Sequence, residues 1–242
     1  MPAQPPRRRK SAAERGAPTR SRRNRRSPEA MQGRILAAAM REFSEHGFSG
    51  GRVDRISRQA HTVDRMLYYY FGNKDRLFRT VLEQAYDRMI QAQQDFQVDA
   101  EDPVEGMRRL VAHSWHHYLE HPELVRLVMT ENLHRGRHIR TSARIRRLSL
   151  PLIDKIAALL RAGQARGLFR RDVEPVEVLL TVMALGFFYM TNRYTLSAWL
   201  GVDLMEEPRP TRWLEHGTRV VLDYLGHPRA VRAGRGLAAA PA

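Results

Sequence analysis

Apolar residues recur at helical spacing through most of the chain, and the first such segment has a clear beginning. Ser27 can cap a helix, Pro28 suits its first position, and Glu29 favours the positive end of the helix dipole. The three- and four-residue spacing of an amphipathic helix then connects Met31, Ile35, Leu36, Ala39, Met40 and Phe43. Gly47 is expected to end this helix, because glycine readily takes the backbone conformation that closes helices.

Short helices are predicted to follow this first long one. A second helix is expected to turn Val53 and Ile56 inward, and a tight connection near residues 61–62 leads to a third helix over residues 63–70. Gly72 breaks the third helix. Asn73 then caps a fourth helix, whose apolar stripe consists of Leu77, Val81, Leu82 and Tyr86.

Beyond residue 97 the pattern stays helical, and no segment shows the period-2 alternation of a strand. The Arg-rich segment 133–142 is expected to be a loop, and Pro151 is expected to kink the helix that contains it. The remaining predicted helices cover residues 103–121, 122–132, 143–165, 176–199 and 211–225. The sequence therefore predicts an all-α protein of about nine helices.

These elements divide the chain into a helix-turn-helix head at residues 28–73 and a larger helical body at 74–226, flanked by tails at 1–27 and 227–242. The first tail carries ten Lys or Arg and one Glu, so it holds nine of the fifteen net positive charges. It is too polar to fold alone, and its charge suits phosphate backbones or anionic lipid. The alternative is a solvated tail whose arginines reflect codon usage.

Composition narrows the class of protein further. Hydrophobic residues make up 43% of the chain, and there is no cysteine, which excludes disulfides, thiolate metal sites and a cysteine nucleophile. The most apolar window, residues 178–190, spans 13 residues, whereas a membrane span needs about 20. We therefore expect a buried helix there, and a soluble cytoplasmic protein without a secretory signal.

The third predicted helix has one apolar and one polar face. Leu67 and Tyr70 can pack inward with Phe71, which leaves Asp64 and Arg65 outside. Helix, turn, short helix, tight turn, short helix is the order of a helix-turn-helix head, whose second short helix reads bases in the major groove. Arginine can take guanine there, and aspartate can accept from the cytosine amino group.

The predicted double-stranded DNA contact extends to both sides of these residues. Tyr68 and Tyr69 have hydroxyl tips suited to phosphate or base edges, and Lys74 begins the fourth helix, where free N–H groups favour a phosphate. The alternative makes the tyrosines ordinary core or surface residues. The predicted DNA-contacting residues are Arg52, Val63, Asp64, Arg65, Met66, Tyr68, Tyr69 and Lys74.

Three motifs within residues 34–85 resemble the DNA-binding head of the TetR family of bacterial transcriptional regulators. They are F-x-E-x-G-F at 43–48, V-D-R-I-S at 53–57 and L-Y-Y-Y-F-G-N-K-D-x-L at 67–77. His61 stands where the family usually has glycine, and Val63 where it usually has a serine or similar helix cap, so Thr62 is an alternative cap. ENLHRGRHIR, LLRAGQARGLFR and LGFFYMTNRYTLSAWLGVDL are similar to one subclass of the family's carboxy-terminal domain.

The resemblance implies a homodimer in which the last two long helices of each chain form a four-helix bundle. Gly186 is expected to permit close approach of helices, although 178–190 also suits the central helix of a monomeric bundle. A small effector is expected to bind inside each body and release the protein, as a repressor, from a palindromic operator. Candidate effector-binding residues are Trp115, Tyr118, Met129, Asn132, Phe187, Tyr189 and Asn192.

Two further functions compete with this one. A nonspecific DNA-compacting protein would use the basic tail. A metal-dependent or hydrolytic enzyme would use the histidine cluster, in which His113, His117 and His121 follow at one-turn spacing while His116 points elsewhere. There is no G-x-S-x-G, phosphate-binding loop or Rossmann fingerprint, so we expect no enzyme, no metal site and no cofactor.

Overall fold

The computed structural model describes residues 27–98, 101–148 and 150–226. The predicted tails, apart from Ser27, lie outside the described residues. Within them the chain forms helices joined by short connections, with a single isolated β-bridge between Phe169 and Gly226. The helices are α2 (Pro28–Gly50), α3 (Val53–Gln59), α4 (Asp64–Phe71), α5 (Lys74–Asp95), α6 (Pro103–Glu120), α7 (Pro122–Leu133), α8 (Arg137–Thr141), α9 (Ala143–Arg147), α10 (Pro151–Ala165), α11 (Pro175–Leu200) and α12 (Arg209–Leu225).

The all-α prediction is confirmed, and so are several helix boundaries that depend only on local chemistry. Ser27 Oγ accepts a hydrogen bond from the Ala30 N–H at 3.1 Å, and Asn73 Oδ1 accepts from the Arg76 N–H at 2.8 Å. Gly47 has φ +65° and kinks α2 instead of ending it, so that the helix resumes through Gly50. These caps satisfy N–H groups that the first turn of a helix leaves free.

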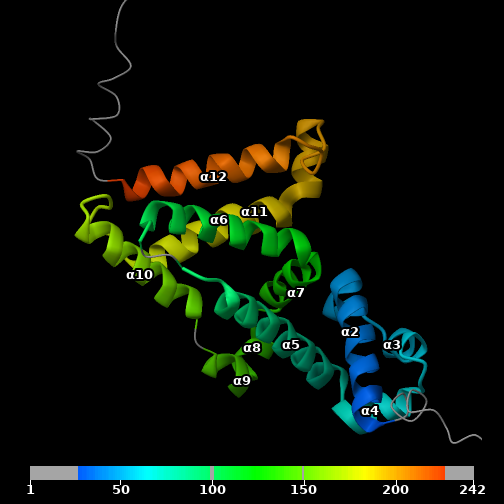
Figure 1. Ribbon diagram of the computed structural model, residues 1–242. Helices are drawn as coiled ribbons and strands as arrows, with labels where there is room; N and C mark the ends of the chain where they lie inside the picture. The colour runs from blue at the N-terminus through cyan, green and yellow to red at the C-terminus, as the bar shows by residue number, and fades with distance from the viewer. Residues whose placement is uncertain (1–26, 99–100, 149, 227–242) are drawn as a thin grey trace, which may run out of the picture.

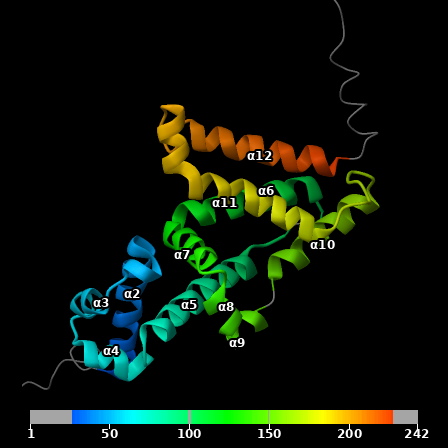
Figure 2. The ribbon, with the colours of Figure 1, turned by 180° about the vertical axis from the view of Figure 1, so that it is seen from behind.

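The two ends of the molecule are joined by α5. Figures 1 and 2 show α2, α3 and α4 at one end, α6, α10, α11 and α12 at the other, and α5 running between them. One buried cluster joins Phe43, Leu67 and Phe78 with Leu124 and Leu127 of α7. The head therefore shares its hydrophobic core with α5 and α7.

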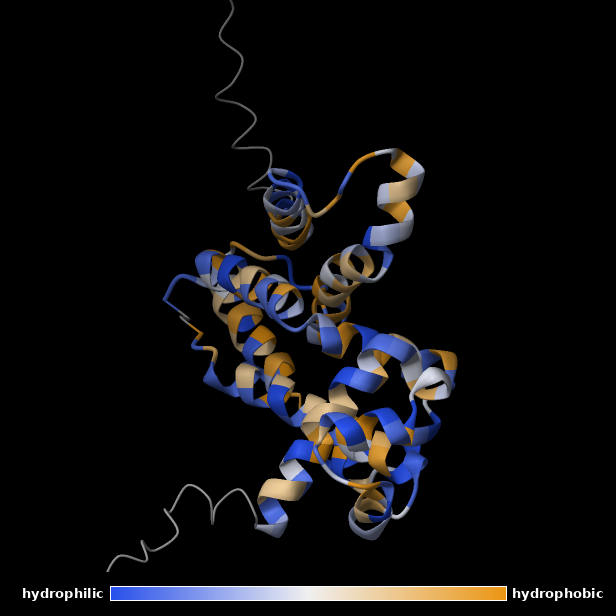
Figure 3. Cartoon of the chain, turned by 90° about the vertical axis from the view of Figure 1, so that its right-hand side faces the viewer, coloured by the Kyte–Doolittle hydropathy of each residue, from blue (hydrophilic) through white to orange (hydrophobic). Residues whose placement is uncertain are grey.

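The body is built around α6, which packs against α10, α11 and α12. Two further buried clusters fill it, one around Met107 and Ile156 and one around Trp115 and Tyr189. Figure 3 shows hydrophobic and hydrophilic stretches alternating around most helices, as the periodic pattern predicts. A Cβ at Gly186 would lie 2.8 Å from the ring of Tyr118, so Gly186 permits a close approach between α11 and α6 of one chain.

Two predictions about the middle of the chain are wrong. The segment 133–142 contains α8, because the Glu131 carboxylate accepts the backbone N–H groups of His138 (2.7 Å) and Ile139 (3.0 Å). The predicted helix 143–165 is two helices, since proline disfavours a helical residue before it and Leu150 has φ −104° and ψ 84°. The described residues therefore form eleven helices, α2 to α12, instead of about nine.

The sequence predicts a buried helix at residues 178–190, but only one part of the surface of this segment is buried. Among the described residues, α11 is the one helix long and apolar enough to pass a length-and-composition test for a membrane span, and 33% of its most apolar window is buried. It packs against α6, α7, α10 and α12. The apolar residues that remain exposed on α11 include Val176, Leu180, Met183, Phe188, Tyr194 and Trp199.

Candidate DNA-binding interface and effector cavity

Helix α4 presents the polar face that the sequence predicts. Leu67 is fully buried, and Tyr70 and Phe71 pack against the same core. The opposite face is open: Tyr69 is 77% exposed, and Asp64, Arg65 and Tyr68 are also exposed. Val63 is exposed as well, whereas Met66 is half-buried. Aromatic and charged side chains that water surrounds in the free chain are thus available for contact with a partner.

The start of α4 is tightly turned. His61 has φ +52°, a left-handed conformation that disfavours residues with a Cβ. Val63 occupies the N-cap position, and its side chain makes no capping hydrogen bond to the first turn of α4. Thr62 therefore does not cap the helix, and the unbonded N–H groups are available to an acceptor such as a phosphate.

Lys74 lies beside the end of α2. Its Nζ is 3.4 Å from the Ser49 carbonyl oxygen and 4.9 Å from the ring centroid of Phe48. Partial burial lowers the pKa of Lys74, against the opposing effect of the Asp75 and Glu42 carboxylates. The ammonium group is therefore positioned at the first turn of α5 before any partner binds.

A buried carboxylate connects α2 and α3 within the head. Glu42 accepts hydrogen bonds from the Arg52 N–H (2.8 Å) and from Arg55 Nε (2.7 Å), which fixes the start of α3 to α2. The Arg52 side chain is exposed, and its Nε is 3.0 Å from Asp54 Oδ1. Arg52 thus lies at the surface but forms an ion pair with Asp54.

A cavity of about 270 Å³ lies among α5, α6, α10 and α11. Its polar side chains come from α5 and α6 and include Gln93, His113, Ser114, His117 and Tyr118. The rest of its wall is mostly apolar, with Met89, Leu152, Ile153, Leu179, Leu180 and Met183. A small apolar cavity with a few polar groups on one side is typical of a ligand site.

The polar groups of this cavity are uncharged near neutral pH. Burial, with the charges of His121 and His113 adding to it, lowers the pKa of His117 to about 4, and burial followed by the nearby Lys155 charge lowers that of His113. Burial raises the pKa of Tyr118 to about 12. Among the described residues, His117 Nε2 and Gln93 Oε1 are buried without a hydrogen-bond partner. Both side chains line the cavity, so a polar group of a ligand would supply a partner that the buried atom lacks.

Three of the predicted effector residues, Trp115, Tyr118 and Tyr189, share one buried cluster, but the set as a whole does not line the cavity. Tyr118 is the one member of that set that lines the cavity. The rings of Trp115 and Tyr189 meet edge to face in that cluster (5.3 Å between ring centroids), and Phe187 packs against it. Asn192 bonds to the Phe188 carbonyl of its own helix. Met129 and Asn132 are exposed on α7. Sequence analysis missed the α5 and α10 walls, because neither helix carries a motif that points to a ligand.

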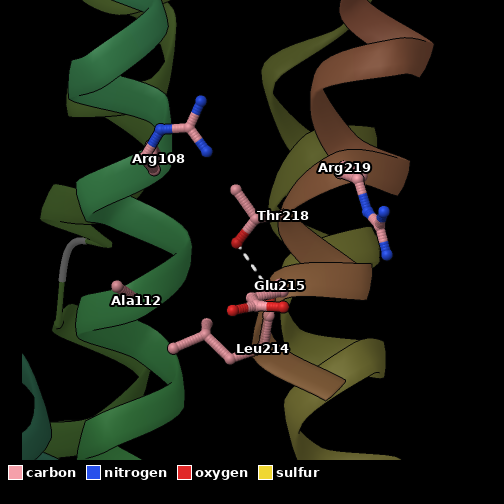
Figure 4. A pocket seen from close by; sticks show the side chains of 6 residues that line it. All are labelled: Arg108, Ala112, Leu214, Glu215, Thr218 and Arg219. Atoms are coloured by element: carbon pink, nitrogen blue, oxygen red, sulfur yellow. Dashed lines mark hydrogen bonds between the residues drawn. The ribbon is translucent and has the colours of Figure 1, made fainter. Parts of the chain in front are cut away.

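A second, wider groove of about 440 Å³ separates α6 from α12. Figure 4 shows its six lining residues, with Arg108 and Ala112 on α6 and Leu214, Glu215, Thr218 and Arg219 on α12. Half of these residues are charged, and the groove lies between two solvent-exposed helix faces. It would enclose a ligand less completely than the α5–α6–α10–α11 cavity does.

The histidines of α6 contact neighbouring rings. Within the parts of the chain that the structure describes, no three His, Cys, Asp or Glu side chains are grouped to hold an ion. His113 stacks on Phe96, with 4.7 Å between centroids, and His117 lies 4.7 Å from the His121 ring. Packing accounts for these rings.

Comparison with known proteins relates both parts of the chain to one class of regulator. The family model described as bacterial regulatory proteins, tetR family, matches residues 35–81, and that of the tetracyclin repressor-like C-terminal domain matches residues 103–221. The chain is 44% identical over 180 residues to the HTH-type transcriptional repressor NicS of Pseudomonas putida, covering 74% of this chain and 85% of the relative. It is 33% identical over 160 residues to the repressor SCO4008 of Streptomyces coelicolor, covering 66% of this chain and 78% of that protein.

A solved structure agrees with the sequence comparison. The crystal structure of SCO4942 from Streptomyces coelicolor, described as a transcriptional regulator, superposes with a TM-score of 0.59. The two chains are 26% identical, and the match covers 82% of this chain and 99% of the other. The arrangement of a helix-turn-helix head on a helical body is therefore shared with a protein of the same kind.

Proposed function

Because the chain belongs to the TetR family of bacterial transcriptional regulators, we propose that it is a homodimeric repressor of transcription. The family consists of DNA-binding regulators and not of enzymes, which removes the hydrolytic alternative. In this proposal the dimer binds a palindromic operator in the cytoplasm and leaves it when a small molecule fills the α5–α6–α10–α11 cavity. The observation that carries the proposal is the open face of α4. Leu67 is fully buried on one side of this helix, whereas Arg65 and Tyr69 are exposed on the other.

This geometry supports the DNA-contacting face that we propose. Arg65 is assigned to a base edge in the major groove, and Tyr68 and Tyr69 to bases or phosphates beside it. Lys74 is assigned to the phosphate backbone, because it stands at the N-terminus of α5, where the helix dipole also favours an anion.

The uncovered apolar face of α11 and α12 supports the homodimer. Leu180, Phe188, Tyr194 and Trp199 on α11, together with Val220 and Tyr224 on α12, are exposed in the single chain. Several exposed large apolar side chains on two neighbouring helices are typical of a protein contact in a soluble protein. Pairing with the same face of a second chain would bury it and would set two α4 helices side by side on one duplex.

The chemistry of the cavity supports an effector that is uncharged and largely apolar. Neutral His113 and His117 supply no positive charge, and Lys155 Nζ is already occupied by the carbonyl oxygens of Gln93 and Gln94. The unpaired Gln93 Oε1 suits a hydrogen-bond donor at one end of the ligand. The aliphatic side chains of α10 and α11 suit a hydrocarbon surface at the other end.

The single helix α5 connects the two sites. It begins at Lys74, on the side assigned to DNA, and reaches Gln93 at the cavity (Figure 1). A ligand that shifts the Gln93 end would move the Lys74 end of a stiff helix. In this way a ligand would change the spacing of the two heads and favour release from the operator.

The test begins with the full-length protein and sheared genomic DNA. Fragments that the protein retains are sequenced and footprinted, and the expected result is a small set of sites with two-fold symmetry, their half-sites about one helical turn or a multiple apart.

Deletion of residues 1–27 distinguishes the repressor from the alternative of a nonspecific DNA-compacting protein. A repressor keeps its preference for those sites, whereas a compacting protein loses nearly all binding. Neutral aromatic alcohols and their carboxylate analogues are then compared for release of the protein from the recovered site.

A further inference from the structure

The effector-binding body contributes an arginine to the DNA-facing end of α5. Arg137 is the first residue of α8, and its Nη2 forms an ion pair with Oδ1 of Asp75, 62 positions earlier in the chain. Asp75 directly follows Lys74. An arginine of the body therefore lies beside the residue that we assign to the DNA backbone.

Lys74 and Arg137 lie over the same aromatic ring. The Lys74 Nζ is 4.9 Å and the Arg137 Cζ 5.3 Å from the ring centroid of Phe48. Two cations on one ring repel each other, and the Asp75 carboxylate beside them offsets that repulsion. A phosphate group that approached this pair would be attracted by both.

The Arg137 guanidinium can donate further hydrogen bonds to a phosphate. Its side chain is 50% exposed, and it has five N–H donors in a planar fork, of which the Asp75 carboxylate occupies only part. An arginine fork of this kind matches the oxygen geometry of a phosphate.

The helix that carries Arg137 is firmly anchored. Glu131 accepts the N–H groups of the first residues after Arg137, and the rings of His134 and His138 pack 5.2 Å and 4.9 Å from that of Phe48. His138 also packs against Phe78 of α5 at 4.8 Å. Arg137 is thus held at a fixed place relative to α5 and the end of α2.

We propose that Arg137 binds the phosphate backbone of double-stranded DNA together with Lys74. The partner is the sugar–phosphate backbone, so the contact adds affinity and no base preference. It goes beyond the function proposed above, because it gives the body its own hold on the duplex. Any displacement of α8 relative to α5 would then weaken DNA binding directly, in addition to the change in spacing between the heads.

The experiment measures the affinity of the full chain for its recovered site and for an unrelated duplex, from about 50 to 300 mM salt. Each phosphate contact contributes about 0.9 to the slope of log K against log salt, so Arg137→Ala should lower the slope by about that amount per bound protomer, on both duplexes. Arg137→Lys should keep the slope. Arg161→Ala, which removes an exposed arginine from α10, should leave both slope and affinity unchanged.

A second pair of variants separates a direct contact from simple neutralisation of Asp75. The double variant Asp75→Ala, Arg137→Ala is compared with Asp75→Ala alone. A lower slope in the double variant supports the phosphate contact. Equal slopes in these two proteins would overturn the proposal, as would an Arg137→Ala protein that binds both duplexes like wild type.

Discussion

Glu131 Oε2 lies 2.7 Å from Nδ1 of His138, and both side chains are buried. The same carboxylate accepts the backbone N–H groups of His138 and Ile139, so one buried group holds the whole of α8 against α7. Through the rings of His138, Phe48 and Phe78 this contact continues to α2 and α5. The arrangement explains why an Arg-rich segment without apolar periodicity is helical.

Replacement of Glu131 should therefore be costly. Glu131→Ala leaves a buried imidazole and two backbone N–H groups without an acceptor, and we expect the free energy of unfolding to fall by about 2–5 kcal/mol. Equilibrium unfolding in urea measures it. Glu120→Ala, at an exposed position of α6, is the control and should change stability by less than about 0.5 kcal/mol. Equal stability of the two variants would show that the carboxylate does not hold α8.

Two glycines in helices should respond in opposite directions. Gly186→Ala places a Cβ 2.8 Å from the Tyr118 ring, and the overpacking should cost about 1–3 kcal/mol. At Gly33, an exposed position of α2, a Cβ meets nothing within 4 Å, so Gly33→Ala should stabilise by about 0.5–1 kcal/mol. Thermal unfolding of both variants tests the pair. A Gly186→Ala protein that unfolds at or above the wild-type temperature would contradict the close approach of α6 and α11.

Arg65 and Lys74 should separate base reading from phosphate binding. Arg65→Ala should relax the preference at one base pair of each half-site, at a cost of about 1–3 kcal/mol on the preferred sequence. Lys74→Ala should weaken binding to all sequences alike. Competition binding against a set of single-base operator variants gives both results. Equal losses across every sequence for the two proteins would refute the assignment of Arg65 to a base.

The buried imidazole of His117 should make stability depend on pH. Its pKa falls from the usual 6.5 to about 4 on folding, so the unfolded chain takes up the proton first. The contribution of the neutral ring is complete above pH 6.5 and is lost as pH falls from 6.5 towards 4. Between pH 7 and pH 5 we expect wild type to lose about 1–2 kcal/mol more than His117→Gln, after allowance for solvent at a half-buried ring.

The measurement is urea unfolding at pH 7, 6 and 5. His116→Gln, which changes an exposed histidine on the same helix, should follow the wild-type pH dependence. If His117→Gln showed the same dependence as wild type, the ring would be protonated as readily in the folded as in the unfolded chain.

The apolar face of α11 should decide the state of association. Phe188 is 54% exposed in the single chain, and Phe188→Asp would place a charge in the proposed dimer contact. We expect the mass from sedimentation velocity at micromolar concentration to halve and operator affinity to drop with it. Leu133→Asp, at an 84% exposed position of α7, should keep the wild-type mass. An unchanged mass for Phe188→Asp would place the contact elsewhere.

Local chemistry in the sequence determined where most helices begin and end and which face of α4 is open. The Ser27 and Asn73 caps, the break at Gly72 and the inward Leu67 all depend on residues within one or two turns of each other. Such short-range preferences can be read from the order of residues alone. For the same reason, the expected contacts of Arg65 and Tyr69 could be stated from the sequence alone.

Tertiary structure decided which helices meet. Periodicity shows that a helix has an apolar face, but the choice of covering helix depends on crossing angles and on the path of the loops. The tertiary structure places Arg137 against Asp75 and Gly186 against the ring of Tyr118. It also forms the cavity from α5, α6, α10 and α11. The predicted effector residues come from α6, α7 and α11, and of these Tyr118 alone lines the cavity, because the space that a ligand can fill lies between helices that are distant in sequence.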